Sequence, residues 1–241
     1  MKLLLSLLFT INSTLALSPV CQLVDDHEFA PLTKDPYNNG YPESRYHLVL
    51  NEFIEEFTPD IEKRGGTFHI LRDWSDGAVN AWAWRIGDEF WLEVPGGMSR
   101  YHLINEFGFL TTLCHELGHL EGGAPHGSEI SYEGQADYYS TMKCMHRILK
   151  RLGHSNDKIL SGIKSLTSYY AFLEKSDPPQ INTPDLTQAR QTLRSHPKSQ
   201  CRFDTMVRAM KCDNKDHFSY DNPNIGACQG SLARPLCWYS P

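Results

Sequence analysis

The chain has 241 residues, with 23 basic and 29 acidic side chains and a formal net charge of −6 at pH 7. This acidic balance argues against nucleic acid or an anionic membrane surface as the main partner. The length suffices for one substantial core, as a single domain or a domain with an appendage.

The N-terminus has the layout of a secretory signal peptide. Lys2 precedes an apolar run over residues 3–9, and small residues surround Ala16. The run is too short to cross a bilayer, and we find no second run long enough to do so. We therefore predict a signal peptide at residues 1–16, with cleavage after residue 18 as the alternative. The protein is expected to be secreted or periplasmic, without stable membrane insertion.

Seven cysteines follow the predicted cleavage site. In an exported chain this number favours disulfides, and an odd count leaves at least one thiol unpaired unless chains are linked to each other. Four of the seven lie after residue 200: Cys201, Cys212, Cys228 and Cys237. We predict a main domain over residues 19–200 with a Cys-rich region over residues 201–241 packed on it.

The first half of the chain predicts a helix followed by strands. Residues 43–63 place apolar side chains at helical spacing among charged ones. Residues 67–71 are rich in strand-forming side chains, and residues 79–86 and 89–94 form two further runs around a turn. A β-hairpin is therefore expected before the next helix.

The second half predicts helices. An apolar stripe over residues 101–121 indicates one long helix that ends at two glycines. Ser128 is a candidate N-cap for a second helix that continues towards Gly153. Further helices are predicted at residues 157–175, 184–194 and 201–212.

The sequence His115-Glu116-x-x-His119 lies near the end of the long predicted helix. Residues four apart share one helix face, so both imidazoles can bind one ion while Glu116 lies beside its open position. That arrangement suits zinc-assisted hydrolysis with Glu116 as the general base. We predict one zinc ion per chain, in an α+β fold with a small antiparallel sheet, a helical zinc-binding core and a disulfide-stapled C-terminal region.

Three residues compete for the third ligand position. Glu133 is favoured, because Asp137 lies one turn later and can accept a hydrogen bond from a ligand histidine. His126 is the alternative, one residue later than in the HExxHxxGxxH pattern. Glu129 is the third candidate and has no evident partner carboxylate.

The combination of HELGH and EGQAD resembles the gluzincin metallopeptidases, which combine HExxH with a downstream ExxxD. The resemblance implies that His115, His119 and Glu133 bind zinc, that Glu116 is the catalytic base and that Asp137 supports a ligand. In thermolysin-like members an edge strand with Asn-Ala-aromatic pairs with the substrate backbone, which implies that role for Asn80 and Ala81. The loop between His119 and Glu133 is shorter here than in thermolysin.

The chain also resembles a group of exported bacterial proteins. They share a GGAP turn, EGQADY, an HP…QCR segment and an RPxCW ending, which lie here at residues 122–125, 133–138, 196–202 and 234–238. This resemblance covers most of the mature chain. It implies export but no particular substrate.

A hydrolase of this type needs a donor for the developing oxyanion besides the metal. The candidates are His196, Arg202, Tyr132 and His154. We select His196 because it precedes the Cys-bounded helix and is well placed if that helix folds over the cleft. We interpret Cys114, beside His115, as an unpaired core residue rather than a nucleophile.

These features predict a secreted zinc metallopeptidase that acts on a peptide or protein. Two alternatives remain open. One is an exported, disulfide-stabilised binding or structural protein with a non-catalytic zinc site, and the other is an amidase of cell-wall peptides. The sequence leaves the oligomeric state open.

Overall fold

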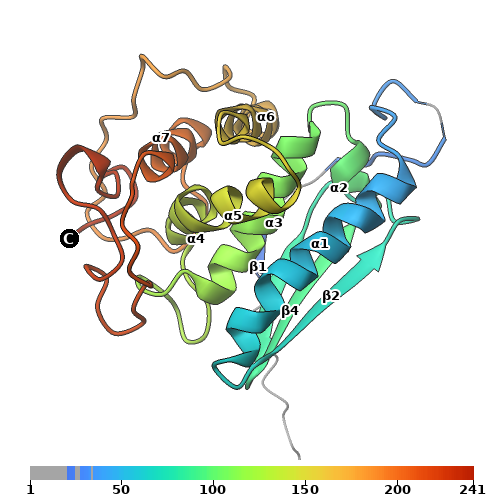
Figure 1. Ribbon diagram of the computed structural model, residues 1–241. Coiled ribbons are helices and arrows are strands. Elements are labelled where there is room, and N and C mark those ends of the chain that lie inside the picture. The colour runs from blue at the N-terminus through green and yellow to red at the C-terminus, as the bar shows by residue number, and fades with distance from the viewer. Residues whose placement is uncertain (1–20, 25–27, 34) are drawn as a thin grey trace, which may run out of the picture.

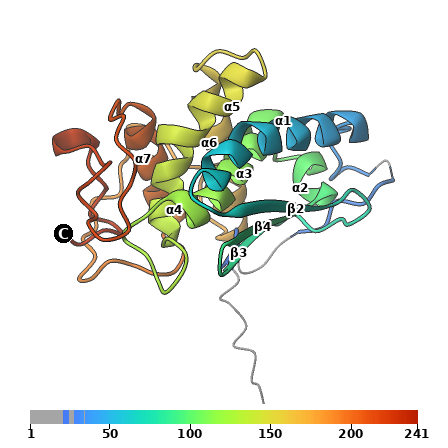
Figure 2. The same ribbon diagram turned by 60° about the horizontal axis from the view of Figure 1, so that its bottom comes forward.

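The structure is a computed structural model that describes residues 21–24, 28–33 and 35–241, with only the main chain at Cys21. The predicted signal peptide lies outside these residues. A four-stranded sheet has helices on one of its faces, and the C-terminal segments lie on the far side of those helices (Figure 1, Figure 2).

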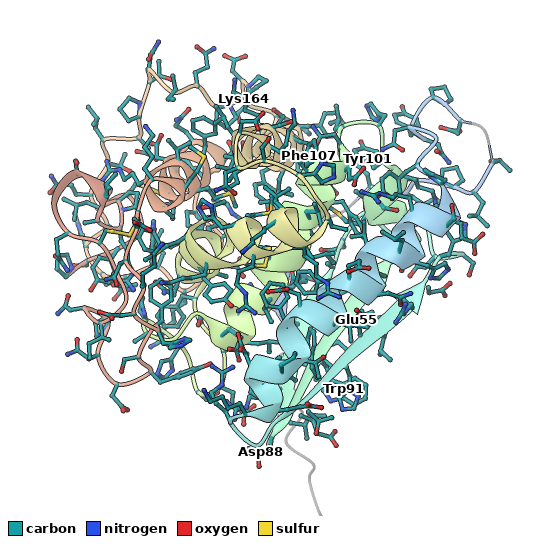
Figure 3. All side chains as sticks on the ribbon, in the orientation of Figure 1. Glu55, Asp88, Trp91, Tyr101, Phe107 and Lys164 are labelled. Carbon is teal, nitrogen blue, oxygen red and sulfur yellow. A yellow bond between two sulfur atoms is a disulfide. The ribbon has the colours of Figure 1, made fainter. Side chains whose placement is uncertain are left out.

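The sheet has the strand order β1-β3-β4-β2. Its strands are β1 (Cys21–Gln22), β2 (Thr67–Asp73), β3 (Trp82–Ile86) and β4 (Glu89–Pro95). The predicted hairpin is present as the antiparallel pair of β3 and β4, and Asp88 lies at its turn (Figure 3). The sheet is mixed rather than purely antiparallel, because β2 pairs with β4 in parallel.

Side-chain alternation along β4 divides the sheet into two faces. Phe90, Leu92 and Val94 are buried on the face that the helices cover, whereas Trp91 stacks on His69 at the outer face, with ring centroids 4.0 Å apart. The predicted N-terminal helix is α1 (Glu43–Glu62), which lies across the covered face (Figure 2). Its apolar stripe, Tyr46, Phe53, Phe57 and Ile61 among others, joins the core.

The helix predicted over residues 101–121 is shorter, and a separate helix precedes it. The two elements are α2 (Gly96–Arg100) and α3 (Glu106–Glu121). The buried Arg100 side chain donates to the carbonyls of Ala30, Trp74 and Asp76 at 2.6 to 2.9 Å, which holds the end of α2 against these loops. Asn105 then caps α3 by accepting a hydrogen bond from the Gly108 amide at 2.8 Å.

The next helix begins at Glu133 rather than at Ser128, and it contains a π-helical turn. Its parts are α4 (Glu133–Tyr139), the π turn η1 (Ser140–Cys144) and α5 (Met145–Arg151). The Ser131 amide donates to the carbonyl of His119 at 2.8 Å, so this part of the chain pairs with the end of α3 instead of starting a helix. Ser128 as an N-cap was therefore wrong.

Two of the three remaining predicted helices are present. They are α6 (Lys158–Leu173) and α7 (Ser199–Met210), followed by the 3-10 turn η2 (Gly230–Leu232). The helix predicted at residues 184–194 was wrong, because side chains bind the main-chain donors there. The Asp204 carboxylate accepts from the Asp185 amide at 2.7 Å, and the Asp185 carboxylate accepts from the Thr187 amide at 2.9 Å.

Three disulfides join the helical half. Cys201–Cys237 and Cys212–Cys228 confirm the predicted C-terminal disulfides, and Cys114–Cys144 links α3 to η1. The interpretation of Cys114 as an unpaired core residue was wrong. Three disulfides in one chain are typical of an oxidising, exported environment.

The α+β class is confirmed. The division at residue 201 stays a prediction, and α7, which begins at Ser199, packs against α4 and α6. Among the described residues, no helix combines the length and the apolar character needed to cross a membrane.

Candidate metal centre

The two motif histidines meet on one face of α3. His115 and His119 are both fully buried, with their rings nearly perpendicular at 88° and their Nε2 atoms 3.0 Å apart. The apolar residues around them, Leu113, Leu117 and Leu120, are buried as well. The motif therefore lies on a helix, as predicted, and this part of the helix is buried.

Glu133, the first residue of α4, supplies a third donor. Its Oε2 lies 3.2 Å from His115 Nε2, and its Oε1 lies 3.6 Å from His119 Nε2. Zinc binds nitrogen and oxygen ligands at about 2.0–2.2 Å in a tetrahedron, whose edges are then roughly 3.3–3.5 Å long. The separation of the two Nε2 atoms and the contacts of each Nε2 with one carboxylate oxygen are of that order, so His115, His119 and Glu133 form a group that could hold a metal ion.

The close contact of α3 and α4 depends on glycines. A Cβ atom at Gly118 would lie 2.7 Å from the Ala136 carbonyl oxygen and 2.8 Å from the Ala136 Cα. A Cβ atom at Gly134 would lie 2.2 Å from the Trp238 ring. Only a hydrogen atom fits at either position: at Gly118 this lets α3 and α4 approach each other, and at Gly134 it lets the Trp238 ring pack on the start of α4 next to Glu133.

Outer hydrogen bonds orient both rings. His119 Nδ1 donates to the carbonyl of Ser131 at 2.8 Å, and His115 Nδ1 lies 2.8 Å from Asp137 Oδ1. In neutral rings the two Nε2 atoms then carry lone pairs. Two such lone pairs 3.0 Å apart repel each other unless a proton or a metal cation lies between them. The proposed role of Asp137 beside a ligand histidine agrees with this contact.

Arg202 of α7 supports Asp137 from behind. Its Nε and Nη2 donate to the Asp137 carboxylate at 2.8 and 3.0 Å, and its guanidinium lies 3.8 Å from the Tyr170 ring centroid. Burial opposes the charge on Asp137, but Arg202 and His115 outweigh burial and lower the Asp137 pKa. Asp137 therefore stays ionised as the acceptor for His115.

Glu116 lies beside this group as a buried carboxyl. Burial raises the pKa of Glu116 to about 8. Neither Glu116 oxygen has a hydrogen-bond partner among the described residues. Buried carboxyl oxygens without partners are costly. A carboxyl group that is buried at such a cost without stabilising the fold is a candidate for contact with a ligand.

The two ring pKa values move in opposite directions. Burial lowers the pKa of His119 to about 4, which keeps this ring neutral and able to bind a metal. Burial also opposes the charge on His115, but Asp137 and Glu133 outweigh it and raise the His115 pKa to about 9. The same two carboxylates attract a metal cation, which would displace that proton.

The alternative ligands lie outside the group. His126 Nδ1 contacts the carbonyl of Gly127, and its Nε2 contacts the carbonyl of Tyr220 at 3.0 Å. Glu129 is not among the three grouped donors. The other possible group in the described chain, Asp185 with Cys201 and Cys237, contains a disulfide and therefore offers no thiolate.

Of the four oxyanion candidates, His196 and Arg202 lie at the centre. His196 Nε2 is 3.3 Å from Glu133 Oε1 and 3.0 Å from the carbonyl of Gln22. The ring of Tyr132 faces Arg194, with the guanidinium 5.8 Å from its centroid. His154, which follows α5, lies beside the start of α3, where its Nε2 is 3.8 Å from Glu106 Oε1.

Asn80 and Ala81 precede β3, because the strand predicted from residue 79 begins at Trp82. Both residues bind the backbone of another part of the same chain. Asn80 Oδ1 accepts from the Val24 amide at 3.3 Å, and its Nδ2 donates to the Val24 carbonyl at 3.1 Å. The Ala81 carbonyl accepts from the Leu23 amide at 2.9 Å.

Sequence reasoning missed two contributions to the centre. The carbonyls of Gln22 and Leu23 face His196 and Arg202, at 3.0 and 3.4 Å. Tyr170 packs under Arg202. No spacing or motif links these positions to the HExxH segment. The resemblance of Asn80-Ala81-Trp82 to the peptide-binding strand of thermolysin-like enzymes indicated that this strand could pair with an extended segment. It did not indicate that residues 22–24 would be that segment.

A hollow of the surface lies away from the three donors. Its volume is about 860 Å³, and its lining includes Arg64, His146 and Phe218 but none of the three donor residues. The donors themselves are closed off, with Glu133 3% exposed and both histidines 0% exposed. The metal centre is therefore an enclosed group of side chains rather than the floor of an open pocket.

No protein-family model, no curated protein and no solved structure matches this chain. The assignment of a function therefore rests on the geometry of the centre and on the sequence motifs.

Proposed function

We propose that the protein is an exported zinc metallopeptidase of the gluzincin type. The observation that carries the proposal is the grouping of three donor residues beside the buried Glu116: the two histidine Nε2 atoms lie 3.0 Å apart, and the Glu133 carboxylate lies 3.2 Å from one and 3.6 Å from the other. A set of two imidazoles and one carboxylate suits zinc with one position left open. The signal-like N-terminus and the three disulfides support export.

His115, His119 and Glu133 would hold the ion, which supplies a Lewis acid for the peptide carbonyl and acidifies a water molecule. Glu116 would accept a proton from the attacking water and return it to the leaving amine. Burial raises the pKa of Glu116 to about 8, and a cation bound nearby would act in the opposite direction. His196 is positioned to donate a hydrogen bond to a substrate carbonyl.

Replacement of Glu116 tests this proposal. The Glu116→Gln variant should bind zinc as the unmodified chain does and lose at least about a hundredfold in peptide hydrolysis, because a general base contributes roughly 10²–10⁴-fold. The matched control is Glu129→Gln, a nearby glutamate outside the donor group. Hydrolysis would be measured with a library of quenched fluorescent peptides and zinc by mass spectrometry. Equal hydrolysis by the two variants would contradict the assigned role of Glu116.

A second candidate function has one observation in its favour. The donors are enclosed, as in a structural metal site whose coordination is completed by the protein. Under that alternative, zinc removal unfolds the chain and Glu116→Gln has no functional consequence. Chelation followed by thermal unfolding and by a hydrolysis assay separates the two functions, because only the peptidase loses a rate that added zinc restores.

A further inference from the structure

A short N-terminal segment, residues 21–24, runs antiparallel to residues 80–83. Cys21 pairs with Ala83 and Gln22 with Trp82 in β1 and β3. The pairing continues through Leu23, whose amide donates to the Ala81 carbonyl at 2.9 Å. Val24 ends it, with both its amide and its carbonyl bound by the Asn80 side chain.

The same segment contacts the metal centre with its main chain. The Gln22 carbonyl lies 3.0 Å from His196 Nε2, and that nitrogen lies 3.3 Å from Glu133. The next carbonyl, of Leu23, accepts from Arg202 at 3.4 Å. Two successive peptide groups are therefore held by residues that also contact the candidate ligands or Asp137.

The mode of binding is that of an extended peptide ligand. Strand pairing and a side-chain amide that binds both the N–H and the C=O of one residue recognise any backbone, and side-chain pockets add selectivity. Leu23 is 0% exposed and Val24 is 7% exposed, so apolar side chains fill the space at these two positions. Another extended peptide with apolar residues could make the same contacts.

We propose that residues 22–24 occupy the peptide-binding groove of the metal centre as an internal competitor, and that an extended substrate peptide binds along residues 80–83 when this segment leaves. This inference rests on the proposed function in that it calls the peptide a substrate. The competition for binding does not depend on catalysis. The segment contacts His196 and Arg202 beside the candidate ligands, so a peptide that replaces it would reach the same two side chains.

The first test weakens the segment within the full chain. Leu23→Pro removes the amide that donates to Ala81, and a proline is poorly tolerated where a ladder hydrogen bond is needed. The matched control is Glu28→Pro, which removes an amide of the same N-terminal region that donates to the Tyr169 hydroxyl instead. We expect kcat/KM for peptide hydrolysis to rise at least about tenfold in Leu23→Pro and to change less than about twofold in the control, because relief of competition raises the competent fraction.

The second test leaves the segment unmutated. The probe is an acetylated, amidated peptide of residues 19–27 with serine in place of Cys21, added to the folded Glu116→Gln chain. Peptide binding should speed amide hydrogen exchange at Leu23 and Val24 at least about tenfold, because these amides lose their acceptors when the segment is displaced. The Val79 amide, which donates to Glu28, should keep its exchange rate.

The outcomes are separable from those for catalysis. If no variant hydrolyses any peptide but the probe binds and frees Leu23 and Val24, the competition stands and the peptidase proposal fails. If the unmodified chain hydrolyses peptides as fast as Leu23→Pro and the probe leaves exchange at Leu23 unchanged, the competition is overturned and the peptidase proposal stands. Failure of the probe to bind the Leu23→Pro chain also overturns the competition.

Discussion

At the scale of single residues, the Asp137 carboxylate contacts both a candidate ligand histidine and a buried arginine. It accepts from His115 Nδ1 and from the Arg202 guanidinium, all within the buried core. Partners of this kind fix the tautomer and the orientation of a metal-binding imidazole. Arg202 in turn compensates a carboxylate that would otherwise be costly to bury.

Asp137→Asn should therefore weaken zinc binding by about 10–100-fold, the range seen when such partners are removed. The amide keeps the shape of the carboxylate, but it lacks the charge that attracts the cation and pairs with Arg202. Zinc affinity would be measured by competition with a chromophoric chelator. The control is Asp88→Asn, at an exposed hairpin turn (Figure 3). Equal affinities in the two variants would exclude the supporting role.

The residues of the centre differ in how far the sequence predicts them. His115 and His119 follow from helical spacing, and Glu133 and Asp137 follow from their own spacing one turn apart. The spacing of Glu133 and Asp137 favoured Glu133 over His126, but only the folded chain shows where the loop after α3 directs each side chain. The contact of Arg202 with Asp137 bridges 65 residues, and no local pattern predicts such a contact.

At the scale of elements, the centre depends on the contact between α3 and α4. α3 carries both histidines and α4 begins with Glu133, so the separation of the two helices sets the donor distances. Gly118 is the point of closest approach, where the Ala136 backbone occupies the place of a side chain. Stability and metal binding should therefore change together when this contact is disturbed.

Gly118→Ala should lower the free energy of unfolding by about 1–3 kcal/mol, the cost of overpacking a close contact. Zinc affinity should also fall, because a wider separation moves Glu133 away from the histidines. Urea unfolding and a zinc titration would measure the two effects. Gly127→Ala is the control, since a Cβ atom there has its nearest neighbours at 3.8 Å. Unchanged zinc affinity in Gly118→Ala would contradict the claim that the separation of α3 and α4 sets the donor distances.

The elements that were predicted well are those with a strong local pattern. The apolar stripe of α1 and the turn between β3 and β4 gave nearly the observed ranges. The error at residues 184–194 arose because helical spacing there competes with side-chain acceptors, such as Asp204, that only the folded chain provides. The parallel pairing of β2 with β4 is likewise a non-local property.

At the scale of the whole molecule, both ends of the described chain converge on the centre. The N-terminal segment contacts His196 and Arg202 with its carbonyls, and α7 supplies Arg202 next to the Cys201–Cys237 disulfide. The four cysteines after residue 200 indicated the C-terminal disulfides, but their pairing and their distance from the candidate metal site required the fold. The Cys-rich region is thus part of the centre's support.

Removal of the Cys201–Cys237 disulfide, in the double variant Cys201→Ser and Cys237→Ser, should cost about 2–5 kcal/mol of unfolding free energy. It should also weaken zinc binding, because Arg202 follows Cys201 directly on α7. The matched control removes Cys212–Cys228, which closes a shorter loop, with a sequence separation of 16 rather than 36. Urea unfolding should detect a loss of stability in both double variants, but only the first should lose zinc affinity. Equal zinc affinities in both double variants would contradict the supporting role of the Cys201–Cys237 disulfide.

The central claim is that one zinc ion is bound jointly by His115, His119 and Glu133. The most direct test is a crystal structure of the zinc-loaded chain with anomalous scattering measured on both sides of the zinc absorption edge. We predict a single strong anomalous peak about 2.0–2.2 Å from His115 Nε2, His119 Nε2 and a Glu133 carboxylate oxygen. A peak coordinated by His126 or Glu129 in place of Glu133, or no peak between the two histidines, would contradict the account.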